Sequence, residues 1–271
     1  MRLLPPASSP ERVVALSIFL SQDSRGEFGT GAGALSESML DRLTRLIGSS
    51  ELPVTWAVGE SLFGELHERF ESQTAVHELA VLGDDSWLGQ TKSRGTIVRK
   101  LNAVVEAAAT MERTATSLLL QGVALDADFD LLAKHGINLV ARDEADARDS
   151  KTTASADRTT QVRTLRFGVW ELATTVKLPR PSSRLGLVGG NVGRLIDRAV
   201  SRGELSHVVI DGQAILDNPG ELRSLERLLE RLAFQQRQGG LRVQTLSSIS
   251  AQLGPSQVRS SATSILRAPA A

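Results

Sequence analysis

The stretch MLDRLTRLIGSSELPVTWAV, residues 39–58, joins an amphipathic helix to a buried strand. The apolar residues that recur at helical spacing are Met39, Leu40, Leu43, Leu46 and Ile47. The segment LPVTWAV that follows is short, apolar and rich in residues that favour strands. A similar segment, RVVALSIF, covers Arg12 to Phe19, ahead of the helix. A helix between two such strands is a βα unit, and this pattern favours a parallel sheet.

The alternation of strand and helix continues along the chain. We expect further strands over residues 75–83, 117–121, 137–141, 207–211 and 241–246, with regular structure also in QVRTLRFGVWEL, residues 161–172. We expect further helices over residues 61–70, 96–113, 129–136 and 221–238, and a last helix after the final strand. Seven or eight βα units without an internal linker predict one α/β domain, a single distorted (β/α)7-type barrel with mainly parallel strands.

Three segments differ in composition from the rest of the chain. Residues 142–160 contain almost no large apolar side chain, so burial cannot offset their ordering entropy and we expect a mobile loop. Residues 1–11 are expected to be flexible, and residues 255–271, rich in Ser, Ala and Pro, to be a disordered tail. The barrel is therefore predicted to span residues 12–254.

Composition excludes several classes of function. The chain of 271 residues carries 31 Lys and Arg and 31 Asp and Glu, which are interspersed, so no basic face favours nucleic acid or an anionic membrane. It has no cysteine and no tyrosine, which excludes disulfides, thiolate zinc sites and either side chain as a catalyst. The apolar run at the N-terminus is too short for a secretory signal, and we expect a cytoplasmic protein. Its oligomeric state has no signature in the sequence.

The stretch AVHELAVLGDDSW, residues 75–87, places a histidine and a glutamate before an apolar run. A zinc-protease helix of the His-Glu-x-x-His type needs a second histidine four residues after His77, but that position is Val81. The apolar run is more typical of a buried strand. On this interpretation Asp84 and Asp85 follow the carboxyl end of a strand, where α/β barrels keep their ligand sites.

Several phrases, taken in order, carry a resemblance to a known family. They are LPVTWAVGESL, VHELA, DLLAKHGINLV, LRFGVWELATTVKLP, HVVIDGQAI and GGLRVQTLSSISAQL. Over residues 12–253 the chain resembles the polysaccharide deacetylase family with its NodB-homology domain. The resemblance implies a distorted (β/α) barrel that binds a divalent metal at the carboxyl ends of the strands, where a carboxylate base and an imidazole acid act on an acetylated sugar.

The first catalytic motif of that family is altered here. In active members the first strand ends in two aspartates, of which one is the base and the other a metal ligand. The corresponding segment reads SIFLSQDS, and direct alignment puts Phe19 and Leu20 at those positions. A gapped alignment gives Gln22 and Asp23 instead, which preserves one carboxylate.

The histidines of the family pattern are also replaced. The His-x-x-x-His metal pair of active members falls on Leu82 and Ser86, neither of which is a useful ligand for this chemistry. The histidine expected at the end of a late strand is matched by Asp211, while His207 lies inside that strand. A metal that lost these imidazoles would lose most of its ligands, and the reaction would lose its general acid.

Our first hypothesis is therefore a non-catalytic relative, a pseudoenzyme that uses no metal or other cofactor and binds a carbohydrate or a protein partner at the strand-end face. Its ligand-binding candidates are Trp87, Trp170 and His77, since aromatic rings can stack on sugars and an imidazole can contact a ligand. The alternative for each is structural: large aromatics are more often core residues, and a histidine in an apolar run is more often buried and hydrogen-bonded.

The second hypothesis is an active, divergent deacetylase, a hydrolase of carbon–nitrogen bonds other than peptide bonds. Its divalent metal would be held by carboxylates alone, because hard cations accept oxygen ligands. The candidate catalytic residues are Asp23, Asp84, Asp85 and Asp211. Aspartates at loop starts are more often helix caps or solvated charges, and bound metal on the purified protein would discriminate between the two hypotheses.

Overall fold

The computed structural model describes residues 12–20, 37–71, 73–83, 94–121, 128–142, 162–179 and 205–254. Its strands are β1 (Val13–Leu20), β2 (Thr55–Val58), β3 (Glu78–Gly83), β4 (Ser117–Leu120), β5 (Leu139–Arg142), β6 (Val162–Thr164), β7 (Trp170–Ala173), β8 (Val176–Leu178), β9 (Leu205–Asp211) and β10 (Arg242–Gln244). Its helices are α1 (Glu37–Ser50), η1 (Glu60–Leu62), α2 (Phe63–Phe70), α4 (Arg94–Ala109), α5 (Phe129–Lys134), η3 (Arg166–Gly168), α7 (Gly212–Leu216), α8 (Pro219–Arg237) and α9 (Leu246–Leu253).

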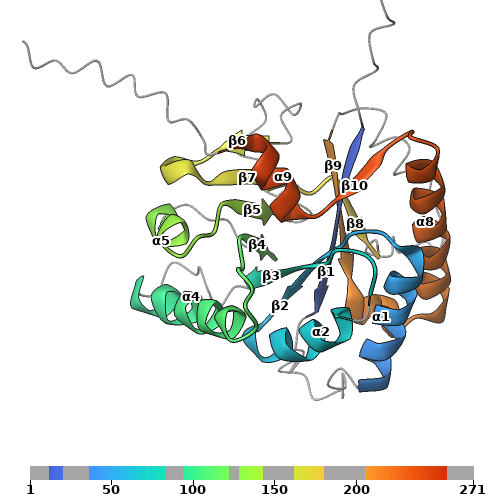
Figure 1. Ribbon diagram of the computed structural model, residues 1–271, viewed down its shortest axis with the longest axis horizontal. Coiled ribbons are helices and arrows are strands. Elements are labelled where there is room, and N and C mark those ends of the chain that lie inside the picture. Colours follow the sequence, from blue (N-terminus) through green and yellow to red (C-terminus); the bar gives the residue numbers. More distant parts are fainter. Residues whose placement is uncertain are drawn as a thin grey trace, which may run out of the picture.

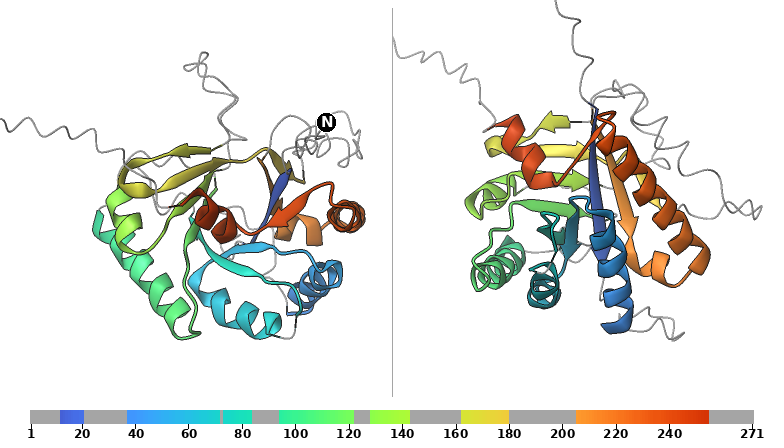
Figure 2. Two further views of the ribbon diagram at one scale, coloured as in Figure 1. Left: turned by 45° about the horizontal axis from the view of Figure 1, so that its top comes forward. Right: turned by 45° about the vertical axis from the view of Figure 1, so that its right-hand side comes forward.

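The ten strands in this part of the chain form one curved sheet. Neighbouring strands follow the order β6-β7-β5-β4-β3-β2-β1-β9-β8, and β10 pairs with β1. Every pair is parallel except β6 with β7. The sheet curls into a half-barrel with helices along its outer side (Figure 1, Figure 2). This confirms the predicted barrel-like α/β fold with mainly parallel strands.

Strand β1 lies in the interior of the sheet, and both of its edges are paired. Along one edge it pairs with β9 over residues 13–19. The other edge is shared, since β10 pairs with residues 13–15 and β2 with residues 17–20. A strand covered in this way needs a nearly continuous apolar run, which VVALSIFL provides.

The two faces of the sheet bury different kinds of side chain, because alternate residues of a strand point in opposite directions. The outward-facing residues, such as Leu16 and Ile18, pack in the main core with Leu43 of α1. The inward-facing residues include small ones such as Ala15, and they pack with Leu246 of α9 in a second core. The small inner residues leave room for a helix against the inner face of the half-barrel.

Most predicted elements are confirmed, with changes at their ends. Strand β3 begins at Glu78, so Val76 and His77 lie before it rather than within it. Helix α4 ends at Ala109, before the predicted end at residue 113, because Glu112 adopts a left-handed conformation with φ of 53°. Gly136 follows α5 with φ of 80°, consistent with its predicted role as a helix stop.

Some sequence predictions concern residues outside the described part of the chain. These are the flexible segment 1–11, the tail over residues 255–271 and the loop over residues 142–160, of which only Arg142 is described, as the last residue of β5. Within the described ranges, none of the helices combines the length and apolar character needed to cross a bilayer.

Candidate functional site

Helix α9 covers the amino ends of the strands. Its first turn is hydrogen-bonded to the residues that begin β2 and β3: Leu246 N donates to Thr55 Oγ1 at 2.9 Å, and Ser247 N donates to Glu78 Oε2 at 2.8 Å. Figure 2 shows α9 lying across the opening of the half-barrel. The carboxyl ends of the strands are therefore the face on which a ligand site is to be sought.

Glu78 is the buried group on which α9 docks. Thr55 Oγ1 donates a hydrogen bond of 2.9 Å to Glu78 Oε2, the same oxygen that accepts from Ser247. Burial raises the pKa of Glu78, and the hydrogen bonds from its neighbours oppose this shift. The carboxyl group is oriented toward a helix start, where backbone N–H groups favour negative charge, so its position is explained by the packing of α9.

Trp170 is the first residue of β7 and lies at the amino end of the barrel. Its Nε1 donates a hydrogen bond of 3.0 Å to the carbonyl oxygen of Gly254, at the end of α9. The ring is half-buried and packs against the inner core. The structure thus places this sequence candidate at the opposite end of the strands from Asp211, where it holds α9.

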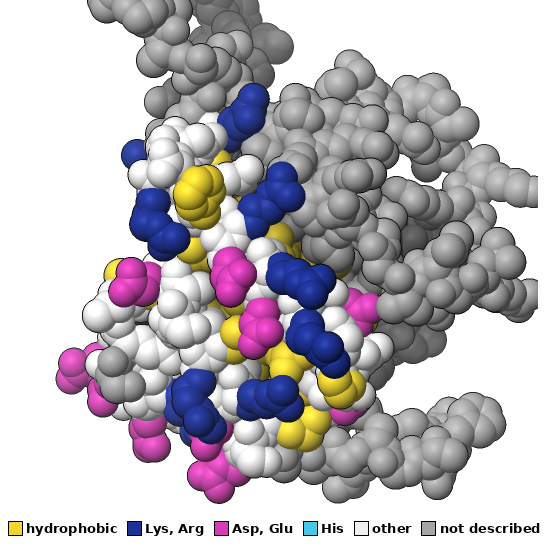
Figure 3. Space-filling model, turned by 90° about the vertical axis from the view of Figure 1, so that its right-hand side faces the viewer, with side chains coloured by type: hydrophobic (Ala, Val, Ile, Leu, Met, Phe, Trp, Pro, Cys, Tyr) yellow, Lys and Arg dark blue, Asp and Glu magenta, His cyan; other side chains and the backbone are white. Residues whose placement is uncertain are grey.

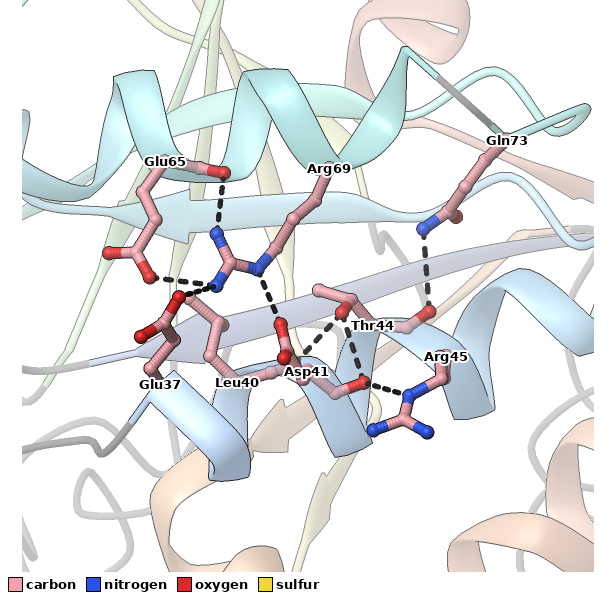
Figure 4. A network of polar contacts seen from close by, with 8 residues as sticks. All are labelled: Glu37, Leu40, Asp41, Thr44, Arg45, Glu65, Arg69 and Gln73. Atoms are coloured by element: carbon pink, nitrogen blue, oxygen red, sulfur yellow. Dashed lines mark hydrogen bonds and ion pairs between the residues drawn. The ribbon is translucent and has the colours of Figure 1, made fainter.

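His77 lies in the layer between the sheet and the helices, just before β3. Its Nε2 is 2.7 Å from Gln73 Oε1, and its ring centroid is 4.8 Å from that of Phe70 and 6.4 Å from that of Trp56. Burial lowers the pKa of His77 to about 4. Gln73 Nε2 in turn donates to the carbonyl of Thr44 in α1 at 3.4 Å (Figure 4). These contacts give His77 a packing role at the amino side of β3.

Asp211 is the one sequence candidate that the described residues place at the carboxyl ends of the strands. It ends β9, opposite Phe19 of β1, and its Oδ1 accepts a hydrogen bond of 3.0 Å from Ala214 N as the N-cap of α7. Lys177 of β8 lies nearby, with Nζ 5.8 Å from the centroid of the Phe19 ring. Burial raises the pKa of Asp211 and outweighs the hydrogen bond from Ala214 and the charge of Lys177, which lower it.

The resemblance matches Phe19, Leu20 and Leu82 to positions of the family's metal site, and the structure describes all three as apolar side chains packed in the cores. Phe19 is buried on the inner face of β1, Leu20 is buried on its outer face, and Leu82 of β3 packs against the inner core. The described residues contain no group of three His, Asp or Glu side chains that could hold a metal ion. The remaining candidates lie outside the described residues: Gln22, Asp23, Asp84, Asp85, Ser86 and Trp87.

Two features of the barrel interior were not identified from the sequence. One is Lys177, whose only signal is a charged residue between Val176 and Leu178. The other is a buried pair in which Ser17 Oγ and His207 Nε2 are 2.9 Å apart. Burial lowers the pKa of His207 to about 3, and the histidine is fully enclosed, so this pair is not accessible to a substrate.

Comparison with known proteins gives a result at the level of fold. No family model matches the sequence, and no curated protein sequence is detectably similar to it. A Mycobacterium smegmatis protein provisionally named a polysaccharide deacetylase superposes with a TM-score of 0.62 at 15% identity, over 92% of each chain. The chain has a polysaccharide deacetylase-like fold. At this identity the likeness carries no activity with it.

Other solved structures with this fold differ in what they do. The 4-alpha-glucanotransferase of Thermococcus litoralis superposes with a TM-score of 0.61 at 12% identity, over 92% of this chain and 41% of that one. A CE4-family pseudoenzyme from Bacillus anthracis superposes with a TM-score of 0.50 at 11% identity, over 89% of this chain and 66% of that one. Structures with the polysaccharide deacetylase-like fold therefore include an enzyme of another class and a pseudoenzyme.

Proposed function

We propose that this protein is a non-catalytic, polysaccharide deacetylase-like protein that binds a carbohydrate at the carboxyl ends of its strands. The observation that carries the proposal is that Lys177 and Asp211 lie together at that end of the barrel, beside the buried ring of Phe19. An ammonium group and a carboxylate that caps a helix, both partly exposed, are suited to hydrogen bonds with sugar hydroxyls. They are a poor set of ligands for a divalent metal.

Electrostatics supports the non-catalytic part of the proposal. Metal-dependent deacetylation needs a cation that polarises the amide carbonyl and makes hydroxide available near neutral pH. The ammonium of Lys177 is close enough to Asp211 to lower its pKa, so it would also repel a divalent cation bound to that carboxylate.

We expect the purified protein to release no acetate from acetylated chitooligosaccharides, with or without added zinc, cobalt or nickel. Loss of an acid or base costs a factor of about a hundred to ten thousand in rate, and loss of metal polarisation adds several kcal/mol to the barrier. The measurement is an acetate assay, paired with metal analysis after purification. Metal-dependent acetate release that Asp84→Ala abolishes would overturn the proposal in favour of the carboxylate site.

Two variants test the role of Lys177, and the quantity measured in both is the affinity for zinc. Leu82→His combined with Ser86→His should create measurable zinc affinity, because Leu82 lies on the inner face of β3. Adding Lys177→Met should tighten that affinity by roughly tenfold, since it removes a cation and keeps an apolar stem near Phe19. Equal zinc affinity with and without Lys177→Met would show that the ammonium does not control the site.

Carbohydrate binding is the positive half of the proposal. We expect chitooligosaccharides to bind the unmodified protein saturably in calorimetric titrations, and Asp211→Asn to weaken binding by roughly tenfold, since a carboxylate accepts stronger hydrogen bonds from hydroxyls than an amide does. Asparagine keeps the cap of α7, so the fold should be retained. Trp170→Phe, at the other end of the barrel, is the control. If Trp170→Phe weakened chitooligosaccharide binding and Asp211→Asn did not, the sugar site would lie at the amino ends of the strands instead.

A further inference from the structure

A groove of about 550 Å³ lies between α1 and α8, on the outer helical layer. Figure 3 shows this side of the molecule, where Lys and Arg side chains are prominent. From α1 the groove is lined by Ser38, Arg42, Arg45 and Ser49, all of them exposed. Their spacing of four, three and four residues puts them on one face of the helix. Leu46 and Leu222 add apolar surface.

The charged residues of α1 are divided between two sides of the helix. Its acids face α2, where Arg69 pairs with Asp41 at 3.0 Å and with Glu37 at 3.9 Å (Figure 4). Arg45 donates from Nε to the Asp41 carbonyl at 3.3 Å, and its guanidinium points away from the Arg69 network in Figure 4. Arg42 makes no hydrogen bond or ion pair with the other described residues. The acids of α1 therefore leave two guanidinium groups available to the groove.

The wall that α8 contributes carries the opposite charge. Glu226 lines the groove across from the two arginines, and it is exposed. A bare anion held by Arg42 and Arg45 would be repelled by this carboxylate. A ligand that carries hydroxyl groups as well as an anionic group would satisfy both walls, because hydroxyls donate to a carboxylate and the anionic group accepts from the guanidinium groups.

We propose that this groove is a second binding site, which takes one sugar unit bearing a carboxylate or a phosphate. The acid group pairs with Arg42 and Arg45, and the ring hydroxyls bond to Glu226 and to the serines. The groove is large enough for a ligand of this size, and the half-buried Leu46 offers an apolar surface to the face of the ring. The site lies outside the barrel and does not depend on the ligand proposed for the strand ends.

The test is titration of the full-length protein with D-glucuronate, glucose 6-phosphate, glucose and inorganic phosphate. We expect saturable one-to-one binding of at least one acidic sugar, with glucose and inorganic phosphate at least tenfold weaker. Preference between the two acidic sugars distinguishes a carboxylate from a phosphate ligand. Inorganic phosphate binding as tightly as both sugars, or no saturable binding of either, would overturn the proposal.

Variants with opposite effects locate the ligand in the groove. Arg42→Ala combined with Arg45→Ala should weaken the acidic sugar at least tenfold. Glu226→Ala should weaken the sugar but strengthen inorganic phosphate, because it removes both a hydroxyl acceptor and a repulsive charge. Arg223→Ala, an exposed position of α8 that does not line the groove, is the matched control. If Arg223→Ala weakened the acidic sugar as much as the double arginine variant does, the effect would come from overall charge, and the proposed site would be contradicted. All four positions are exposed, and thermal melting checks that each variant is folded.

Discussion

Replacing Trp56 with alanine should lower the free energy of unfolding by about 3–5 kcal/mol, the largest single effect that we expect. The indole is fully buried in the main core, and its centroid is 5.3 Å from that of Phe70. Removing the ring leaves a cavity between β2 and the helical layer, which the surrounding structure can fill only in part. Urea unfolding, followed by circular dichroism, measures the change.

Trp56→Phe is the matched comparison. The indole Nε1 is buried, and the described residues give it no hydrogen-bond partner. Phenylalanine keeps most of the apolar surface and removes this unpaired donor, so the loss should stay below about 1.5 kcal/mol. Phe234, an exposed residue of α8, supplies the surface control, since Phe234→Ala should change stability by no more than about 0.5 kcal/mol. A cost for Trp56→Ala no greater than that of Phe234→Ala would refute the core assignment.

The second large effect concerns pH, and it centres on His207. This histidine is buried within β9 beside Ser17, and its pKa falls from 6.5 to about 3 on folding. Between these two pH values the unfolded chain binds a proton that the folded protein does not, so stability is lost as the pH falls. From pH 7 to pH 5 this residue alone should remove about 2 kcal/mol from the free energy of unfolding.

Other buried groups contribute to the pH dependence, so the test compares two proteins. His77 acts in the same direction as His207, whereas Glu78 and Asp211 have raised pKa values and act in the opposite direction. The variant His207→Gln removes the contribution of His207 to the pH dependence and leaves those of His77, Glu78 and Asp211 in place. As the pH falls from 7 to 5, the free energy of unfolding of the unmodified protein should therefore decrease by about 2 kcal/mol more than that of the variant. Parallel stability curves would show that His207 is not held neutral by the fold.

Much of the fold could be predicted because its signals are local. A strand buried on both faces must be apolar along its whole length, and β1 and β9 show this pattern in the sequence. Helix α8 shows apolar residues at helical spacing, and it begins at Pro219, two residues before the predicted start at residue 221. Element ends were less certain, as at β3, where the strand begins at Glu78 although the apolar run starts earlier.

The candidate site was predictable only in part. Asp211 was identified because the family resemblance matches it to a histidine at the end of a late strand, and it does end β9. The partners that define its surroundings come from other strands: Phe19 from β1 and Lys177 from β8. A lysine between two apolar residues gives no indication of which residues of other strands its side chain will lie beside.

By itself the sequence determined the kinds of element, their order and the alternation of buried faces, since these follow from the spacing of apolar residues along a short segment. Only the tertiary structure decided that α9 folds back to cover the amino ends, where it docks on Glu78, and that Trp170 holds it there. It also decided that β1 lies between β2 and β9. The physical reason is that these contacts join residues far apart in the chain. Their geometry depends on sheet order, which residue spacing within a segment does not specify.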